Sequence, residues 1–212
     1  MTSTMREHAL RQRQAVDAFE KAISSGVIAQ VHDAYTQLEI TGTWSGAFQR
    51  IGRLGHTNKL ILPEKFKRWF LDEWTNKGDD FRDSVNDDRT LVQALLVLLP
   101  RYTGPAIQLF RGETFFNRRR RTYGASWTST QSVAEGFARG NKRCYEGGSV
   151  VLVTIAPPEA IVCAPAVLAN GYGEDEYLVD RRKLKQVDVI NRFPQQTIEE
   201  NSAQLAIVGA AG

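Results

Sequence analysis

Residues 126–139 read SWTSTQSVAEGFAR and join a hydroxyl-rich, strand-like segment directly to a helical one. The helical part covers residues 132–139, where Ser132 and Glu135 have the spacing of a helix capping box. Hydroxyl side chains in front of a helix commonly cap its first turn, so capping alone explains residues 126–130. The same hydroxyls can also bind a ligand. The stretch therefore predicts a strand-to-helix junction and leaves two roles open for its serines and threonines.

Short apolar segments on both sides of this junction are rich in β-branched residues and predict strands. They cover residues 106–110, 149–155, 176–179 and 187–190. Because the first hundred residues show helical periodicity and the strands follow, the order predicts an α+β fold rather than a doubly wound sheet. The expected domains are a helical region (1–103), a strand-rich core (104–192) and a C-terminal tail (193–212).

Two helices are expected at the start of the helical region. The first is predicted by apolar residues three and four positions apart, which are Val16, Phe19, Ile23 and Val27. Residues 27–38 predict a second helix. Residues 41–58 are rich in Gly, Thr and Ser and predict an ordered loop.

An aromatic stripe predicts a further helix that begins near Pro63. Its members are Phe66, Trp69, Phe70 and Trp74. A stripe of this kind is core far more often than it is a binding site. The last helix of the region covers residues 91–99, with Asp87 or Asp88 as its cap and Pro100 after its end.

The composition, 42% hydrophobic and 24% charged, is that of an ordinary soluble globular protein. The longest apolar run, residues 91–99, is too short to span a bilayer. Residues 1–25 lack the apolar centre of a secretory signal. Cys144 and Cys163 cannot form a disulfide framework or a metal site by themselves. The sequence predicts a cytoplasmic protein, in its own cell or delivered to a target cell, with no membrane partner and no metal.

A run of four arginines, residues 118–121, predicts a basic loop, and Lys142 and Arg143 follow further along the chain. Such a run is usually a solvated loop. The second interpretation is a landing site for phosphate, on a cofactor or a polynucleotide. The formal net charge of +3 does not decide between the two.

Residues 109–113 read LFRGE and place Arg111 at the end of an apolar strand. An arginine on a buried strand needs an anionic partner, which a bound ligand or a structural salt bridge can supply. Gly112 would let a ligand approach the backbone closely.

Residues 171–180 read GYGEDEYLVD and bring three acids onto an otherwise apolar strand. Glu174 and Glu176 are two residues apart, so in an extended strand they project to the same side. Two carboxylates held this close raise each other's pKa, which is a mark of functional sites.

Together, these three segments resemble the arginine–serine–glutamate class of ADP-ribosyltransferases, which includes the actin-modifying clostridial toxins and cholera toxin. That family has a strand arginine, then an aromatic-x-Ser-Thr-Ser strand that feeds a helix, then a Glu-x-Glu turn and strand. This chain supplies the same order in Arg111, Trp127, Thr128, Ser129, Thr130, Glu174 and Glu176. The resemblance covers residues 104–192, and Gln131 stands where the family usually has its last serine.

The resemblance implies a split, mainly antiparallel β-sheet core and a catalytic set of Arg111, Ser129, Glu174 and Glu176. NAD is the implied substrate, and the expected cofactor contacts are Arg111, Gly112, Trp127, Ser129, Thr130 and Glu176. Glu176 would stabilise the oxocarbenium-like charge that develops on the ribose. Glu174 would orient the attacking nucleophile and take its proton. Arg111 would bind the pyrophosphate or the adenosine-ribose side of NAD, and Ser129 would position Arg111 and the glutamate.

The leading hypothesis is a mono-ADP-ribosyltransferase, a toxin or effector, that modifies a macromolecular acceptor. The Glu-x-Glu pattern resembles family members that modify arginine side chains of proteins. RNA or DNA as the acceptor, and an NAD glycohydrolase that uses water, remain alternatives. A non-enzymatic binding module is disfavoured because both glutamates are retained. An inhibitor or antitoxin protein is a further possible partner.

Overall fold

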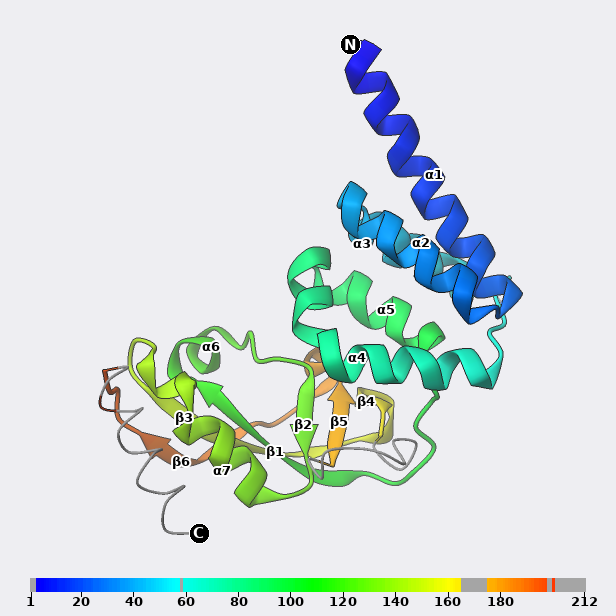
Figure 1. Cartoon of the computed structure of the whole chain (residues 1–212). Helices are drawn as coiled ribbons and strands as arrows, with labels where there is room; N and C mark the ends of the chain where they lie inside the picture. The colour runs from blue at the N-terminus through cyan, green and yellow to red at the C-terminus, as the bar shows by residue number, and fades with distance from the viewer. Residues whose placement is uncertain (1–2, 58, 165–174, 198–199, 201–212) are drawn as a thin grey trace. The chain divides into compact units, whose positions relative to one another are not determined.

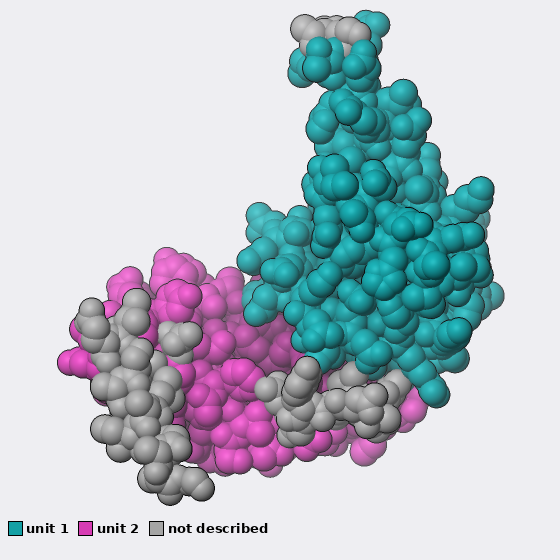
Figure 2. Space-filling model, viewed as in Figure 1, with its two compact units in different colours: residues 1–101 teal, residues 102–212 magenta. Residues whose placement is uncertain are grey.

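A computed structural model describes residues 3–57, 59–164, 175–197 and 200 of the chain (Figure 1). It divides into two compact units, residues 1–101 and residues 102–212 (Figure 2). The described part of the first unit is helical, and the second unit contains a sheet with a few helices. The predicted α+β class is therefore confirmed.

The described part of unit 1 consists of successive helices joined by short connections. They are α1 (Ser3–Ser25), α2 (Ile28–Thr41), α3 (Trp44–His56), α4 (Glu64–Val85) and α5 (Asp88–Leu98). Gly42 ends α2 in the left-handed region at φ 61°. Asp87 caps α5 through a hydrogen bond that its carboxylate accepts from the Thr90 backbone N–H at 2.9 Å, so the predicted cap is confirmed.

The core of unit 1 is a cluster of aromatic rings. Trp44 packs edge-on against Phe19, Tyr35 and Phe81. The predicted stripe on α4 contributes to this core, because Phe66, Phe70 and Trp74 are buried there, while Trp69 is half-buried. The interpretation of that stripe as core is confirmed.

The predicted loop over residues 41–58 is wrong, because helix α3 fills most of it. Trp44, Phe48 and Ile51 are buried at helical spacing along one side of α3. Gly52 faces α5, where a Cβ would lie 3.1 Å from the Cβ of Gln93. The glycine that indicated a loop thus allows two helices to pack closely.

Unit 2 is built on a six-stranded sheet of order β4-β5-β2-β1-β3-β6, and each recorded strand pair is antiparallel. The strands are β1 (Ile107–Thr114), β2 (Ser126–Thr128), β3 (Ser149–Ala156), β4 (Ile161–Cys163), β5 (Glu176–Val179) and β6 (Asp188–Phe193). The sequence predicted all of these strands except β4. Among the described residues of this unit are the helices α6 (Phe115–Arg120) and α7 (Gln131–Arg139) and the short 3-10 turns η1 (Asn141–Cys144), η2 (Pro158–Ala160) and η4 (Arg181–Lys183).

The sheet buries side chains on both faces. One face carries a cluster that includes Leu109, Trp127 and Leu152. Helix α7 covers the other face over β1 and β3 (Figure 1), where Ala134 and Ala138 pack against Val151. Small residues on α7 let its backbone approach the sheet closely.

Two local predictions around the sheet are wrong. Helix α7 begins at Gln131, so Ser132 lies inside its first turn and cannot be the cap of a capping box. Glu135 instead accepts a hydrogen bond from the Gln131 side-chain amide at 2.9 Å. The arginine run is not a loop either: α6 includes the run as far as Arg120, and Arg121 ends the helix at φ 55°.

Candidate functional site

Arg111 lies on β1 and is held at two points of its guanidinium group. Its Nε donates to Oε2 of Glu113 at 2.8 Å, and its Nη1 donates to the carbonyl oxygen of Ser126 on β2. Only 14% of its side chain is exposed. Gly124 makes room for the guanidinium, since a side chain there would collide with Nη2 of Arg111. The structure thus shows an internal anionic partner for Arg111.

That partner, Glu113, is a buried carboxylate surrounded by donors. Besides Arg111, it accepts from the backbone N–H groups of Thr114 (2.8 Å) and Gly124 (3.1 Å) and from the Asn117 side-chain amide (3.1 Å). Burial acts to raise its pKa, but the charges of Arg111 and Lys142 and the hydrogen bonds from Arg111 and Thr114 lower the pKa of Glu113 to about 2. Glu113 is therefore ionised throughout the neutral range.

Sequence reasoning did not assign Glu113 to the site. A signal was present, because residues two apart on a strand share a face, so an acid at this position can pair with Arg111.

Gly112, expected at the cofactor, lies under helix α7. A Cβ on Gly112 would collide with the carbonyl oxygen of Ala134 and the backbone nitrogen of Ala138. Gly112 thus allows helix α7 to pack closely on the strand. A ligand at this position could contact only the backbone N–H and C=O groups of Gly112.

Ser129 follows the last residue of β2 and is hydrogen bonded to Tyr177 on β5. Burial raises the pKa of Tyr177, and the neighbouring Tyr102 and Asp175 add to that effect, whereas the hydrogen bond from Ser129 acts in the opposite direction. The hydroxyl of Thr130 lies 3.5 Å from Oδ2 of Asp175. The serine–threonine segment therefore contacts the start of β5.

Glu176 is the first residue of β5 and pairs with Thr128 on β2. Thr128 in turn pairs with Phe110 on β1. Its side chain is half-buried. Burial chiefly raises the pKa of Cys163 on the neighbouring strand to about 11, and the charge of Glu176 contributes in the same direction. Glu176 thus adds negative charge at the end of the central strands.

The sheet order β5-β2-β1 places Glu176, Ser129 and Arg111 on three adjacent strands or directly after them. Phe110, Thr128 and Glu176 are in register and share one face, so strand alternation puts Arg111 on the opposite face. The motifs therefore lie on adjacent strands but on opposite faces of the sheet. The guanidinium of Arg111 contacts Glu113 and Ser126 rather than Ser129.

Two other expected site residues stand apart from this arrangement. Trp127 is a core residue with 2% exposure, and it packs edge-on against Tyr123. Glu174 lies outside the described residues. Among the described residues, no group of three or more His, Cys, Asp or Glu side chains could hold a metal ion.

The chain was compared with protein-family models, with curated proteins and with solved structures, and none of them matches it. In the part of the chain that the structure describes, no helix has both the length and the apolar character needed to cross a membrane.

Proposed function

We propose that unit 2 is an ADP-ribosyltransferase core that uses NAD and transfers its ADP-ribose to a macromolecular acceptor. Two observations support this function: the order of motifs along the chain, which resembles the arginine–serine–glutamate class, and the sheet order β5-β2-β1. The sheet order carries the proposal. It brings the arginine strand, the serine segment and the glutamate strand next to one another although Arg111 and Glu176 are far apart in sequence.

Glu176 is assigned to the reacting ribose. In the transfer, the bond between the ribose anomeric carbon and nicotinamide breaks, nicotinamide leaves with the bonding electrons, and an acceptor atom bonds to that carbon and loses its proton. Positive charge develops on the ribose during this exchange, as in glycoside cleavage. A carboxylate at the start of β5 would stabilise that charge and can hold a ribose hydroxyl.

Arg111 is assigned to the phosphates of NAD. Its Nε and Nη1 are held by Glu113 and Ser126, so Nη2 is the part of the guanidinium left to meet a phosphate oxygen. A guanidinium fixed in this way loses little rotamer freedom on binding. Glu113 is therefore a positioning residue for Arg111.

The acceptor is assigned from the Glu-x-Glu pattern alone. By resemblance, Glu174 would draw the proton from the acceptor, and an arginine side chain of a protein is the first expectation. A toxin or effector that acts in a cytoplasm fits this activity. Water as the acceptor would make the chain an NAD glycohydrolase, and the assay below separates the two.

Glu176→Gln is expected to abolish both transfer and NAD cleavage, with a loss of about 10²-fold or more, because it removes the charge that faces the cationic transition state. Nicotinamide release from NAD and transfer of labelled ADP-ribose to lysate components are the measurements. Glu146→Gln removes an exposed acid from the same unit and is the matched control with unchanged activity.

The same assay identifies the reaction. Label that protease removes indicates a protein acceptor, and label that nuclease removes indicates nucleic acid. Nicotinamide release without labelled product indicates a glycohydrolase. A folded Glu176→Gln protein with wild-type turnover would remove Glu176 from the mechanism.

A further inference from the structure

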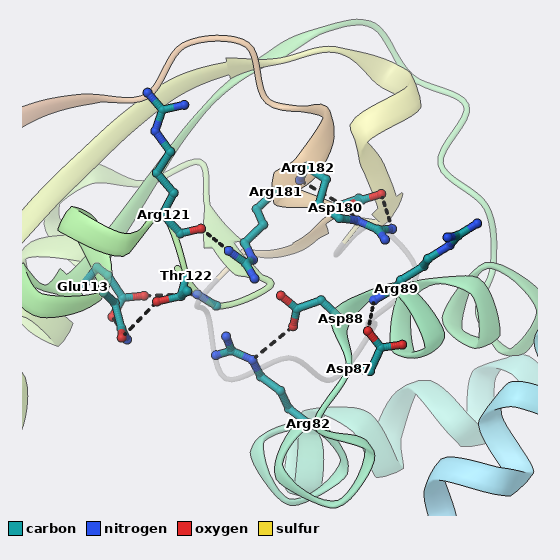
Figure 3. Close-up of polar contacts among 12 residues, drawn as sticks. Arg82, Asp87, Asp88, Arg89, Glu113, Arg121, Thr122, Asp180, Arg181 and Arg182 are labelled. Carbon is teal, nitrogen blue, oxygen red and sulfur yellow. Dashed lines mark hydrogen bonds and ion pairs between the residues drawn. The ribbon is translucent and has the colours of Figure 1, made fainter.

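Two basic segments that are far apart in sequence meet on unit 2. The first is residues 118–121 at the end of α6, and the second is residues 181–185, which begin with η4. Nη1 of Arg181 donates a hydrogen bond to the carbonyl oxygen of Arg121, which joins the two segments directly (Figure 3). We call the surface formed by residues 118–121 and 181–185 the basic surface.

The basic surface has a large excess of positive charge. Residues 118–121 and 180–185 contain eight Arg or Lys side chains and one acid, Asp180. Asp180 is buried and accepts hydrogen bonds from Nε and Nη2 of Arg182 at 2.7 and 2.9 Å (Figure 3). Its negative charge is therefore paired with the neighbouring Arg182. Arg119, Arg120 and Arg121 are exposed. These charges would attract a polyanion.

An exposed aromatic ring lies beside these charges. The side chain of Phe116 on α6 is 41% exposed, and the guanidinium of Arg120 lies over its ring, 3.5 Å from the centroid. Flat aromatic and guanidinium groups next to phosphate-binding cations are the features on which single-stranded nucleic acids stack their bases. An acidic protein segment would pair with the cations, but its carboxylates would not stack on the aromatic ring.

We propose that the basic surface binds single-stranded nucleic acid, with Arg119, Arg120 and Arg121 at the phosphates and the Phe116–Arg120 pair against a base. This binding goes beyond the proposed transfer reaction and does not depend on NAD. It gives unit 2 a means of holding RNA or DNA whether or not the nucleic acid is itself modified.

The test measures binding of the full chain, without NAD, to a fluorescent oligouridine of about 15 nucleotides. Wild-type affinity should fall steeply as salt rises from about 50 to about 200 mM, because phosphate contacts release counterions. The combined variant Arg119→Gln, Arg120→Gln, Arg121→Gln should bind more weakly and lower the slope of log affinity against log salt by about 2. The matched control, Arg6→Gln, Arg11→Gln, Arg13→Gln on α1, removes the same charge from exposed positions and should behave as wild type.

A second pair of variants tests stacking. Phe116→Ala should weaken oligouridine binding by about tenfold, whereas Phe137→Ala, an exposed phenylalanine on α7, should not. Neither change should affect polyglutamate of similar charge. Replacing oligouridine by oligothymidine separates RNA from DNA, and tighter binding of either supports the proposal.

Three results would overturn the inference: no binding by the wild type at low salt, equal salt slopes for the two triple variants, or equal affinity for polyglutamate and oligouridine with no effect of Phe116→Ala. Because NAD is absent, these results are separate from those for Glu176→Gln. Circular dichroism spectra and thermal unfolding like those of the wild type would show that the variants are folded.

Discussion

Four hydrogen-bond donors converge on the carboxylate of Glu113, which is 2% exposed. A buried charge is costly unless it is paired and fully hydrogen bonded, and here both conditions are met. The pair with Arg111 therefore rigidifies the strand that carries the proposed phosphate-binding arginine.

Stability is expected to depend on pH through Glu113. Its folded pKa of about 2 lies below its ordinary value of 4.5, so the fold favours the ionised form. The resulting stability is fully present above about pH 4.5 and is lost as pH falls toward 2. At about 1.4 kcal/mol per pH unit, the difference amounts to roughly 3 kcal/mol. Urea unfolding of the wild type and of Glu113→Gln, followed from neutral to acid pH, measures this pH-dependent contribution of Glu113 to the free energy of unfolding.

Glu113→Gln should be less stable than the wild type at neutral pH, and the gap should narrow below about pH 4.5. Comparing the two proteins cancels the titration of the other carboxylates. A gap that stays constant down to acid pH would show that the charge of Glu113 contributes nothing to stability.

The sequence could indicate the three segments of the candidate site but neither the order of their strands in the sheet nor which side chains touch. The motif order indicated Arg111, Ser129 and Glu176, and the sheet places their segments side by side. The spacing of Arg111 and Glu113 permits their pairing, but the hydrogen bonds from Gly124 to Glu113 and from Ser129 to Tyr177 depend on how distant segments come together, which no linear pattern fixes.

At the scale of elements, the sequence predicted most helices and strands but missed α3, α6 and β4. The strand β3 has a continuous apolar run over residues 150–153, whereas β4 has only three residues and α6 only six, too few to show a period. The glycines of residues 41–58 predict a loop, but Gly52 lies in α3 because its role, close contact with α5, is a tertiary one that the local sequence does not reveal.

Two glycines of unit 2 test how α7 sits on the sheet. Gly112→Ala should destabilise the protein by about 1–3 kcal/mol, because its Cβ would meet the backbone of α7, which cannot move without repacking. Gly136→Ala should instead stabilise it by about 0.5–1 kcal/mol, since no atom lies within 4 Å of the added Cβ in the middle of α7. Thermal or urea unfolding measures both.

This packing requires Gly112→Ala to lower the free energy of unfolding and Gly136→Ala to raise it. A Gly112→Ala protein as stable as the wild type would mean that α7 does not rest directly on β1 at this position.

For the whole molecule, the order of helices and strands was enough to predict the α+β class, because helical and strand periodicities occupy separate parts of the chain. The division into residues 1–101 and 102–212 follows the same change of pattern. The role of unit 1 could not be predicted, since its conspicuous aromatic residues are committed to its own core.

Expression of the full chain in a bacterial cytoplasm should stop growth, because the proposed activity would deplete NAD and modify cell components. Glu176→Gln should relieve the arrest at equal soluble protein, and Gly136→Ala, which leaves the proposed site untouched, should not. Arg111→Ala is also expected to relieve it, but that change leaves Glu113 buried without its guanidinium partner, at a cost of about 3–5 kcal/mol, so its effect includes unfolding. Growth curves together with intracellular NAD measure the outcome. Equal arrest by the wild type and Glu176→Gln would attribute the toxicity to something other than NAD chemistry.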